Sequence, residues 1–240
     1  MANLSLVVIL LCLVMSACAR EQTVGDRVAQ FGASVDTRLA PLFTAAAVPY
    51  PPSKVTLIGL KQEKMLQLYA AGTDGQYRFI RSYPILAASG TPGPKLREGD
   101  AQVPEGLYRI ELLNPNSRFH LSLRINYPND FDRAQAKSEG RRNLGGDIMI
   151  HGNAVSIGCL AMGDPAAEDL FVLAARTGLR NIQVILSPVD FRVREIAKPN
   201  ADAPPWLGQL YREIKTELGK YAVRKEAEPI HLGDVAPRAR

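Results

Sequence analysis

The middle of the chain consists of short hydrophobic runs separated by turn residues, and this pattern restricts it to a β-rich core. Runs rich in Val, Ile, Leu and Tyr occupy residues 55–60, 65–70 and 77–83, and a glycine-containing turn at 71–75 separates the last two. Further runs cover residues 107–113, 119–125, 147–150 and 182–186. Short runs of this composition between turn signals are typical of antiparallel strands. We therefore expect a mostly β core, interrupted by a glycine- and proline-rich loop at 87–106.

Helices are expected on both sides of this core. Residues 23–47 place hydrophobic side chains at spacings of three and four, and the helix stops before the prolines at 51–52. Asp164 and Pro165 provide an N-cap carboxylate and a proline at the first helical position, which predicts a helix to residue 176. A last helix opens at residues 204–206, and we assign Trp206 to its packing face and not to a sugar platform. Residues 229–240 are expected to form a loose tail.

The N-terminus predicts export. Residues 4–17 are almost entirely apolar, which fits a signal peptide and is too short to span a hydrocarbon core of ~30 Å. Residues 17–19 match ordinary signal cleavage, whereas residues 15–18 resemble a lipobox whose cysteine, Cys18, becomes lipidated. We expect a periplasmic protein that is either soluble or lipid-anchored to the outer membrane through Cys18. An uncleaved N-terminal membrane helix is a third alternative.

The amino-acid composition and net charge limit the kinds of molecule that this protein is expected to bind. The 240 residues are 46% hydrophobic and 22% charged, which is ordinary for a globular protein with one sizeable domain. The net charge of +5 suits an anionic environment such as a cell-envelope polymer, but the basic residues are scattered. We therefore expect no nucleic-acid partner. The expected division is a targeting segment at 1–19, a helical extension at 20–52, the β domain at 53–190, and a C-terminal helix and tail at 191–240.

A single thiol remains after the targeting segment. Cys12 and Cys18 lie within that segment, so Cys159 has no disulfide partner, and it stands eight residues after His151. A thiol attacks carbonyls as thiolate, and imidazole can take its proton near neutral pH. The two side chains meet if His151 ends a strand and residues 153–158 loop back. We also expect His151 to favour the thiolate, so that Cys159 is alkylated faster than a free peptide thiol.

Glycines flank the intervening loop, and Ser156 lies within it. Gly152 and Gly158 permit a tight backbone, so the amides near Cys159 can point at a developing oxyanion, while Ser156 can fix the shape of the loop. The alternative interpretation is a buried packing cysteine beside a strand-end histidine. A zinc site is disfavoured, because no second cysteine exists in the domain, and His120 and His231 lack ligand spacing.

These motifs resemble those of a known family. Ile-His-Gly at 150–152 and Ser-Ile-Gly-Cys at 156–159 are similar to the signature of L,D-transpeptidases with the YkuD-type catalytic domain. The resemblance spans about residues 55–186, and it identifies 53–190 as an L,D-transpeptidase-type catalytic domain with a β-sandwich or barrel core. Residues 119–129 resemble the YafK-like subgroup in particular. Further matching segments are 93–95, 99–100 and 104–110.

The resemblance implies a cysteine acyl-transfer reaction on peptidoglycan stem peptides. Cys159 would attack the carbonyl at the L-centre of meso-diaminopimelate, and the amides of Gly158 and Cys159 would hold the oxyanion. His151 would act as general base and then acid, oriented by the Gly152 carbonyl. No metal or organic cofactor is implied. Tyr127 and His120 are candidates to line the substrate cleft, with a structural role for Tyr127 and a solvent-facing ring for His120 as the alternatives. Lys95 and Arg109 are candidates to meet stem-peptide carboxylates, with a solvated surface role as the alternative for each.

Two departures from the family pattern leave the fate of the acyl-enzyme open. Ile157 replaces the histidine of the usual Ser-His-Gly-Cys, and the loop between His151 and Cys159 is shorter than in typical members. Both features are similar to the YafK-like branch, in which some members hydrolyse bonds at diaminopimelate. The alternatives are therefore a transpeptidase, a hydrolase that cuts the link between diaminopimelate and a murein-linked lipoprotein, and a non-catalytic murein-binding module.

Overall fold

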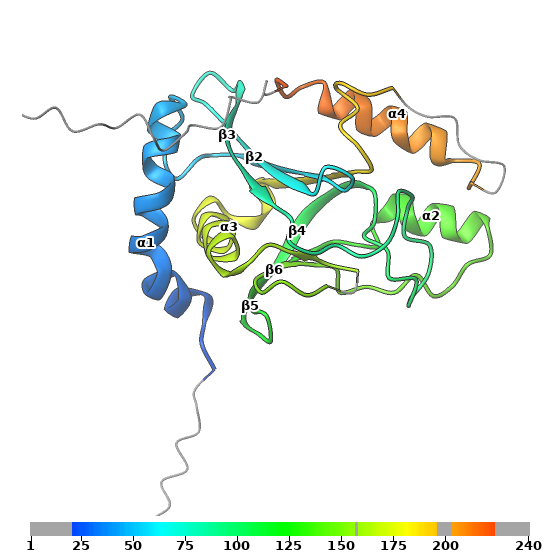
Figure 1. Ribbon diagram of the computed structural model, residues 1–240, viewed down its shortest axis with the longest axis horizontal. Helices are drawn as coiled ribbons and strands as arrows, with labels where there is room; N and C mark the ends of the chain where they lie inside the picture. The colour runs from blue at the N-terminus through cyan, green and yellow to red at the C-terminus, as the bar shows by residue number, and fades with distance from the viewer. Residues whose placement is uncertain (1–20, 157, 196–202, 224–240) are drawn as a thin grey trace, which may run out of the picture.

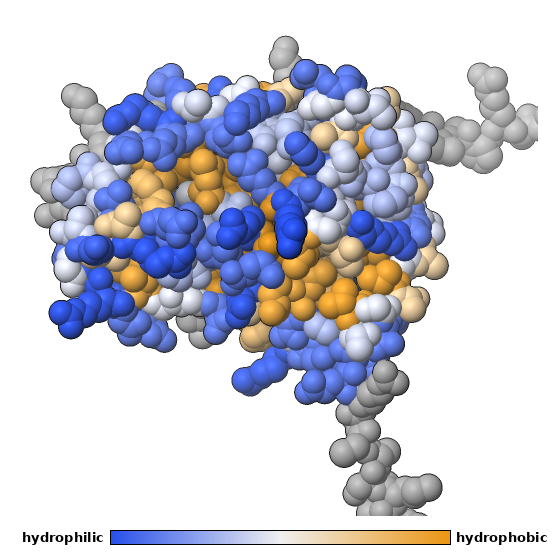
Figure 2. Space-filling view, turned by 180° about the vertical axis from the view of Figure 1, so that it is seen from behind, coloured by the Kyte–Doolittle hydropathy of each residue, from blue (hydrophilic) through white to orange (hydrophobic). Residues whose placement is uncertain are grey.

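The computed structural model describes residues 21–156, 158–195 and 203–223. The expected targeting segment at 1–19, the expected tail at 229–240 and position 157 lie outside the described residues. Hydrophilic side chains cover most of the face seen in Figure 2, and hydrophobic surface gathers to the right of its centre. In the part of the chain that the structure describes, no helix has both the length and the apolar character needed to cross a bilayer.

One mixed sheet forms the centre of the described structure (Figure 1), with its strands in the order β3-β2-β1-β8-β4-β5-β6-β7. Neighbouring strands are antiparallel except for two parallel pairs, β1 with β8 and β6 with β7. The strand bounds are β1 Val55–Leu60, β2 Met65–Ala71, β3 Tyr77–Pro84, β4 Gly106–Ser117, β5 His120–Ile125, β6 Met149–His151, β7 Leu160–Ala161 and β8 Ile182–Ser187.

The sheet curls until its two ends approach each other. Strand β4 is long enough to serve two partners, since its first residues pair with β8 and its later residues pair with β5. At the other end, the Leu86 amide donates to the Ala161 carbonyl and the Ala161 amide donates to Ala87, both at 2.9 Å. The segment after β3 thereby borders β7, and the sheet takes a barrel-like form. The mostly β core with flanking helices that the sequence predicts is confirmed.

Four α-helices surround this sheet in the described residues: α1 Val24–Ala45, α2 Asp130–Ser138, α3 Asp164–Thr177 and α4 Leu207–Leu218. Helices α1 and α3 lie side by side on one side of the sheet, and α4 lies across the other (Figure 1). Strand β1 is buried along its whole length because it has a hydrophobic core on each face. Val55 and Leu57 join the core beneath α1 and α3, whereas Ile58 and Leu60 join the core beneath α4.

The N-terminal helix is part of the main core. Val35, Leu39 and Phe43 on α1 are fully buried against it. The Arg38 guanidinium donates to the Asp169 carboxylate of α3 at 2.7 Å, which also fixes the helix electrostatically. The segment expected as an extension therefore supplies core side chains to the β domain.

Two elements that the sequence patterns did not reveal are α2 and β7. Helix α2 follows a turn signal and begins at the N-cap Asn129, whose side chain and that of Asp132 form a reciprocal capping box. It buries only Ala136 fully, so it carries no hydrophobic stripe. Strand β7 has two residues, too few for any periodicity. The turn expected at 114–117 is the continuation of β4 to Ser117.

A buried ion pair fixes the loop expected at 87–106. The Lys61 ammonium, at the end of β1, donates to the Glu105 carboxylate and to the carbonyls of Gly93 and Val103, each at 2.9 Å. Glu105 also accepts from the Gly93 amide at 2.8 Å and from the Tyr211 hydroxyl of α4 at 2.8 Å. Burial lowers the pKa of Lys61, and the adjacent Glu105 opposes that shift. The loop is thereby tied to both the sheet and the C-terminal helix.

We expect Glu105→Ala to destabilise the protein by about 3 kcal/mol, because it leaves the Lys61 ammonium buried without its counter-charge. Chemical denaturation followed by circular dichroism measures the change in unfolding free energy. The matched control is Glu111→Ala, which removes one partner of the half-exposed pair with Arg124 and should leave the midpoint nearly unchanged. Equal midpoints for Glu105→Ala and wild type would contradict a structural role for the buried pair.

Candidate active site

The pairing of β6 with β7 places Cys159 beside the strand that ends at His151. Ile150 pairs with Leu160 and His151 pairs with Ala161 in parallel register. Cys159 immediately precedes β7, and successive side chains in a strand point to opposite faces. The Cys159 Sγ contacts the Met149 amide of β6, so the thiol lies against the strand that ends at His151.

His151 is held as a neutral base. Its side chain is only 2% exposed, and its Nδ1 lies 2.6 Å from the Gly152 carbonyl oxygen. A carbonyl oxygen only accepts, so Nδ1 carries the proton and the lone pair of the neutral ring is at Nε2. Burial lowers the pKa of His151, and the Gly152 bond opposes that shift. The ring also packs against Phe119, with centroids 4.8 Å apart.

The Cys159 thiol is half-buried between backbone groups of the neighbouring strand. Its Sγ accepts from the Met149 amide at 3.4 Å and donates to the Asp147 carbonyl at 3.7 Å. Burial raises the pKa of Cys159, and the Met149 amide opposes that shift. Desolvation thus favours the neutral thiol and the neutral imidazole over the thiolate expected from the sequence.

Gly152 occupies a place where no side chain fits. A Cβ atom there would lie 2.5 Å from an Asp164 carboxylate oxygen and 2.8 Å from the Phe119 carbonyl oxygen. That Asp164 oxygen accepts from the Asn153 amide at 2.7 Å. The sequence predicts Asp164 as the N-cap of α3, but the N-cap is Gly163 and Asp164 is the first helical residue. Its carboxylate anchors the catalytic loop instead, which a local sequence signal cannot reveal.

The two amides expected to form an oxyanion hole already have partners. The Gly158 amide donates to the Ser89 hydroxyl at 2.5 Å, and the Cys159 amide donates to the Ser156 hydroxyl at 2.9 Å. The Ser156 hydroxyl in turn donates to the Cys159 carbonyl, which closes a tight turn and fixes the loop as expected for Ser156. Gly158 has φ +93°, a left-handed conformation that favours glycine. Ser89 lies in the loop after β3, and no sequence motif indicated it.

Tyr127 and Lys95 lie beside the catalytic segment but serve as internal supports. The Tyr127 hydroxyl lies 3.3 Å from the Lys95 carbonyl and 3.2 Å from the Leu144 carbonyl, and its hydrogen bonds connect the two loops that carry them. The Lys95 ammonium is buried and donates to Asp100 at 2.6 Å and to the Arg97 carbonyl at 2.9 Å. These contacts occupy the hydroxyl of Tyr127 and the ammonium of Lys95. Neither the solvated role nor the carboxylate-binding role expected for Lys95 fits this burial.

The side chains of His120 and Arg109 have surroundings other than the thiol. The His120 ring approaches a Glu168 oxygen of α3 at 3.0 Å and packs on Phe31 of α1, so it joins elements of the fold. Arg109 is exposed and lines a separate hollow of about 220 Å³ near the starts of β1 and β8. Cys159 and Ser156 thus share one turn beside β6, the strand that ends at His151, which bonds Gly152. His120 borders Gly152 through its Cβ atom, and Arg109 lies apart at the other hollow.

Exposed hydrophobic side chains flank the dyad. Phe119, 38% exposed, packs on His151; Val155, 56% exposed, lies in the catalytic loop; and Leu86, 50% exposed, approaches Gly163 just beyond β7. Large apolar side chains with this exposure commonly mark a binding surface. We name these three residues the apolar rim. The sequence did not indicate them, because they come from three separate segments.

Comparisons with known proteins agree on the catalytic domain. The model of the family described as L,D-transpeptidase catalytic domain matches residues 53–185. A curated protein of Escherichia coli (strain K12) named "Putative L,D-transpeptidase YafK" is 38% identical over 133 residues, which are 53% of this chain and 51% of that protein. The chain thus spans about half the length of the curated relatives it matches.

Two solved structures are also similar. The helical cell shape determining protein Pgp2 from Campylobacter jejuni has a TM-score of 0.47 and 24% identity, covering 60% of this chain and 50% of that one. Bd1075 from Bdellovibrio bacteriovorus has a TM-score of 0.42 and 19% identity, covering 73% of this chain and 58% of that one.

We expect Cys159 to react with iodoacetamide more slowly at pH 7 than a free cysteine peptide, because burial raises its pKa. The rate should continue to rise at pH values where the free peptide has reached its plateau. Peptide mapping by mass spectrometry assigns the label to Cys159, and Cys159→Ser is the control. A reactivity midpoint below that of the free peptide would contradict the neutral resting thiol.

Proposed function

This chain belongs to the L,D-transpeptidase catalytic domain family, and on that basis we propose that it is a cysteine acyl transferase acting on peptidoglycan stem peptides. The observation that carries the proposal is the contact of its domain's one thiol with the Met149 amide of β6, the strand that ends at a buried histidine whose tautomer is fixed. The same arrangement supports Cys159 as nucleophile and His151 as general base.

In the first half-reaction, His151 Nε2 takes the proton of the Cys159 thiol while Sγ attacks the carbonyl at the L-centre of meso-diaminopimelate. Sγ forms a bond to that carbon, and the carbonyl electrons move to its oxygen. When the tetrahedral intermediate collapses, the bond to the leaving amine breaks and His151 returns the proton to that amine. The products are a thioester at Cys159 and a free amine, and no charge remains on the dyad.

The Gly158 amide is the better oxyanion donor of the two expected. Its present acceptor, the Ser89 hydroxyl, belongs to another loop and can yield to a substrate oxygen. The Cys159 amide is held within its own turn by Ser156, which also bonds the Cys159 carbonyl. We therefore assign the first hydrogen bond to the oxyanion to Gly158, with the displaced Ser89 hydroxyl free to donate a second one.

In the second half-reaction an acceptor attacks the thioester, and His151 removes its proton. An amine gives a new peptide crosslink or an attached lipoprotein, whereas water gives hydrolysis at diaminopimelate. The apolar rim of Leu86, Phe119 and Val155 borders the route to the thioester and disfavours free access of water. For this reason we favour transfer over hydrolysis. The apolar segment at 4–17 supports export to the periplasm, with or without a lipid anchor at Cys18.

Incubation of the purified protein with murein sacculi should generate new muropeptides that liquid chromatography and mass spectrometry resolve. We expect crosslinks between two diaminopimelate residues, or exchange of an added amine, because the thioester is a transferable acyl group. Cys159→Ala should lose all products, since it removes the nucleophile. His151→Ala should slow product formation by 10²–10⁴-fold, the usual contribution of general acid–base catalysis.

The other outcomes separate the competing functions. Loss of lipoprotein-linked muropeptides without new crosslinks would favour the hydrolase. Binding of wild-type protein and Cys159→Ala to sacculi with equal strength, with no muropeptide change from either, would favour a non-catalytic murein-binding module.

The pH dependence of kcat/KM should show a broad plateau across neutral pH. Activity requires neutral His151, and burial lowers its pKa, so the acidic limb should lie below pH ~6.5. Burial raises the pKa of Cys159, so the alkaline limb should lie above the range of a free thiol, where the dyad loses the proton that the leaving amine needs. An acidic limb above pH ~6.5 would instead indicate a resting thiolate–imidazolium pair.

A further inference from the structure

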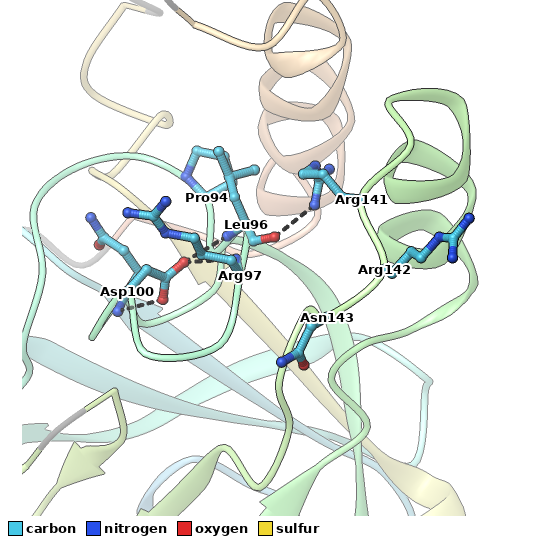
Figure 3. Close-up of a pocket in the computed structure, with 8 residues that line it drawn as sticks. Pro94, Leu96, Arg97, Asp100, Arg141, Arg142 and Asn143 are labelled. Carbon is cyan, nitrogen blue, oxygen red and sulfur yellow. Dashed lines mark hydrogen bonds between the residues drawn. The ribbon is translucent and has the colours of Figure 1, made fainter.

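A cleft of about 540 Å³ lies between the loop at 94–102 and the segment at 141–143 (Figure 3). Its two walls are fixed to each other. The Glu98 amide donates to the Asn143 carbonyl at 3.1 Å, and the Arg141 guanidinium donates to the Leu96 carbonyl at 2.8 Å. The Tyr127 hydroxyl bridges the same two loops, as described above. The shape of this cleft is therefore set before any ligand arrives.

The cleft adjoins the catalytic dyad through both walls. On one wall, the Gln102 carbonyl oxygen lies 3.6 Å from the position that a Cβ atom of Gly158 would occupy. The other wall, residues 141–143, is followed in the chain by Asp147 and then by β6. The Asp147 carbonyl contacts the Cys159 thiol at 3.7 Å. A peptide whose carbonyl carbon rests at Cys159 can therefore extend directly into the cleft.

The cleft carries an excess of positive charge. Asp100 neutralises Lys95 at 2.6 Å, and Glu139 neutralises Arg141. Among the residues that the structure describes, no acidic partner meets the side chains of Arg97 and Arg142. Figure 3 shows these two side chains pointing to opposite sides.

Arg97 stands on the wall that borders the catalytic loop. Its backbone is clamped, since its amide donates to Asp100 at 3.0 Å and its carbonyl accepts from Lys95 at 2.9 Å. The position of the Arg97 Cα atom is thus fixed while its guanidinium remains available. The ion pair of Lys95 with Asp100, which takes Lys95 out of ligand binding, is what holds Arg97 in place.

We propose that this cleft is a subsite for a carboxylate of the stem peptide and that Arg97 is the residue that binds it. The inference rests on the proposed function, because it takes the acyl group at Cys159 to be diaminopimelate. That residue has two carboxyl-bearing centres, so attack at the L-centre carbonyl leaves a free carboxylate at the D-centre. A guanidinium presents two parallel N–H donors that match the two oxygens of a carboxylate.

The test uses Cys159→Ala protein, which binds without turnover, and two synthetic stem tetrapeptides. One carries a free carboxylate at the D-centre of diaminopimelate, and in the other that group is amidated. Isothermal titration calorimetry should show the free form binding about tenfold more tightly, and Arg97→Gln should remove that preference. Arg142→Gln, the matched control from the same cleft, should keep it. Arg97 is exposed, so an unchanged melting temperature is expected for its variant.

The outcomes for the subsite and for the enzyme are separable. If Arg97→Gln weakens the binding of both peptides equally, or of neither, the proposed carboxylate subsite is wrong. This holds even if the wild-type protein forms products from sacculi. If the preference depends on Arg97 but no product forms from sacculi, the subsite stands and the acyl-transferase proposal fails. In the active enzyme, Arg97→Gln should raise KM for the free-carboxylate peptide by about tenfold and leave kcat within about twofold, whereas a larger loss of kcat than of binding would overturn the role.

Discussion

The parallel pairing of β6 with β7 is the constraint on which the whole site depends. With only two residues, β7 is held in place by what surrounds it: Ala161 pairs with His151 on one side and bonds Ala87 on the other. The register matters because a shift by one residue would turn Cys159 to the opposite face of the sheet. Gly152 permits the close approach of the Phe119 carbonyl that this short return requires. The curled sheet is therefore what brings Cys159 against the strand that ends at His151, eight positions earlier in the chain.

Burial favours the uncharged forms of both Cys159 and His151. Desolvation raises the pKa of Cys159 and lowers that of His151, so a thiolate–imidazolium pair is disfavoured until a substrate carbonyl accepts the electron pair. A protonated thiol is also a poor target for oxidants, which react with thiolates.

Hydrophobic patterning was sufficient to predict most strands and three helices, because those elements bury regular stripes of side chains. It could not predict α2, whose only fully buried side chain is Ala136, or β7, whose two residues have no period. Within the candidate site, His151 and Cys159 stay predictions from the motif, and the fold adds the contact of Cys159 with β6. The roles of Lys95 and Asp164 depend on partners brought near by the fold, and the local sequence around Asp164 indicated an N-cap that the helix does not use.

The C-terminal helix, whose role the sequence leaves unexplained, supports both walls of the cleft between residues 94–102 and 141–143. Tyr211 of α4 donates to Glu105, which fixes the loop that carries Arg97. Trp206, at the N-cap of the same helix, donates from Nε1 to Glu139 at 2.7 Å, and Glu139 is the ion-pair partner of Arg141 on the opposite wall. One rigid helix therefore sets the distance between the two walls. The support of this cleft thus comes from a segment outside the matched catalytic domain, since α4 begins beyond residue 185.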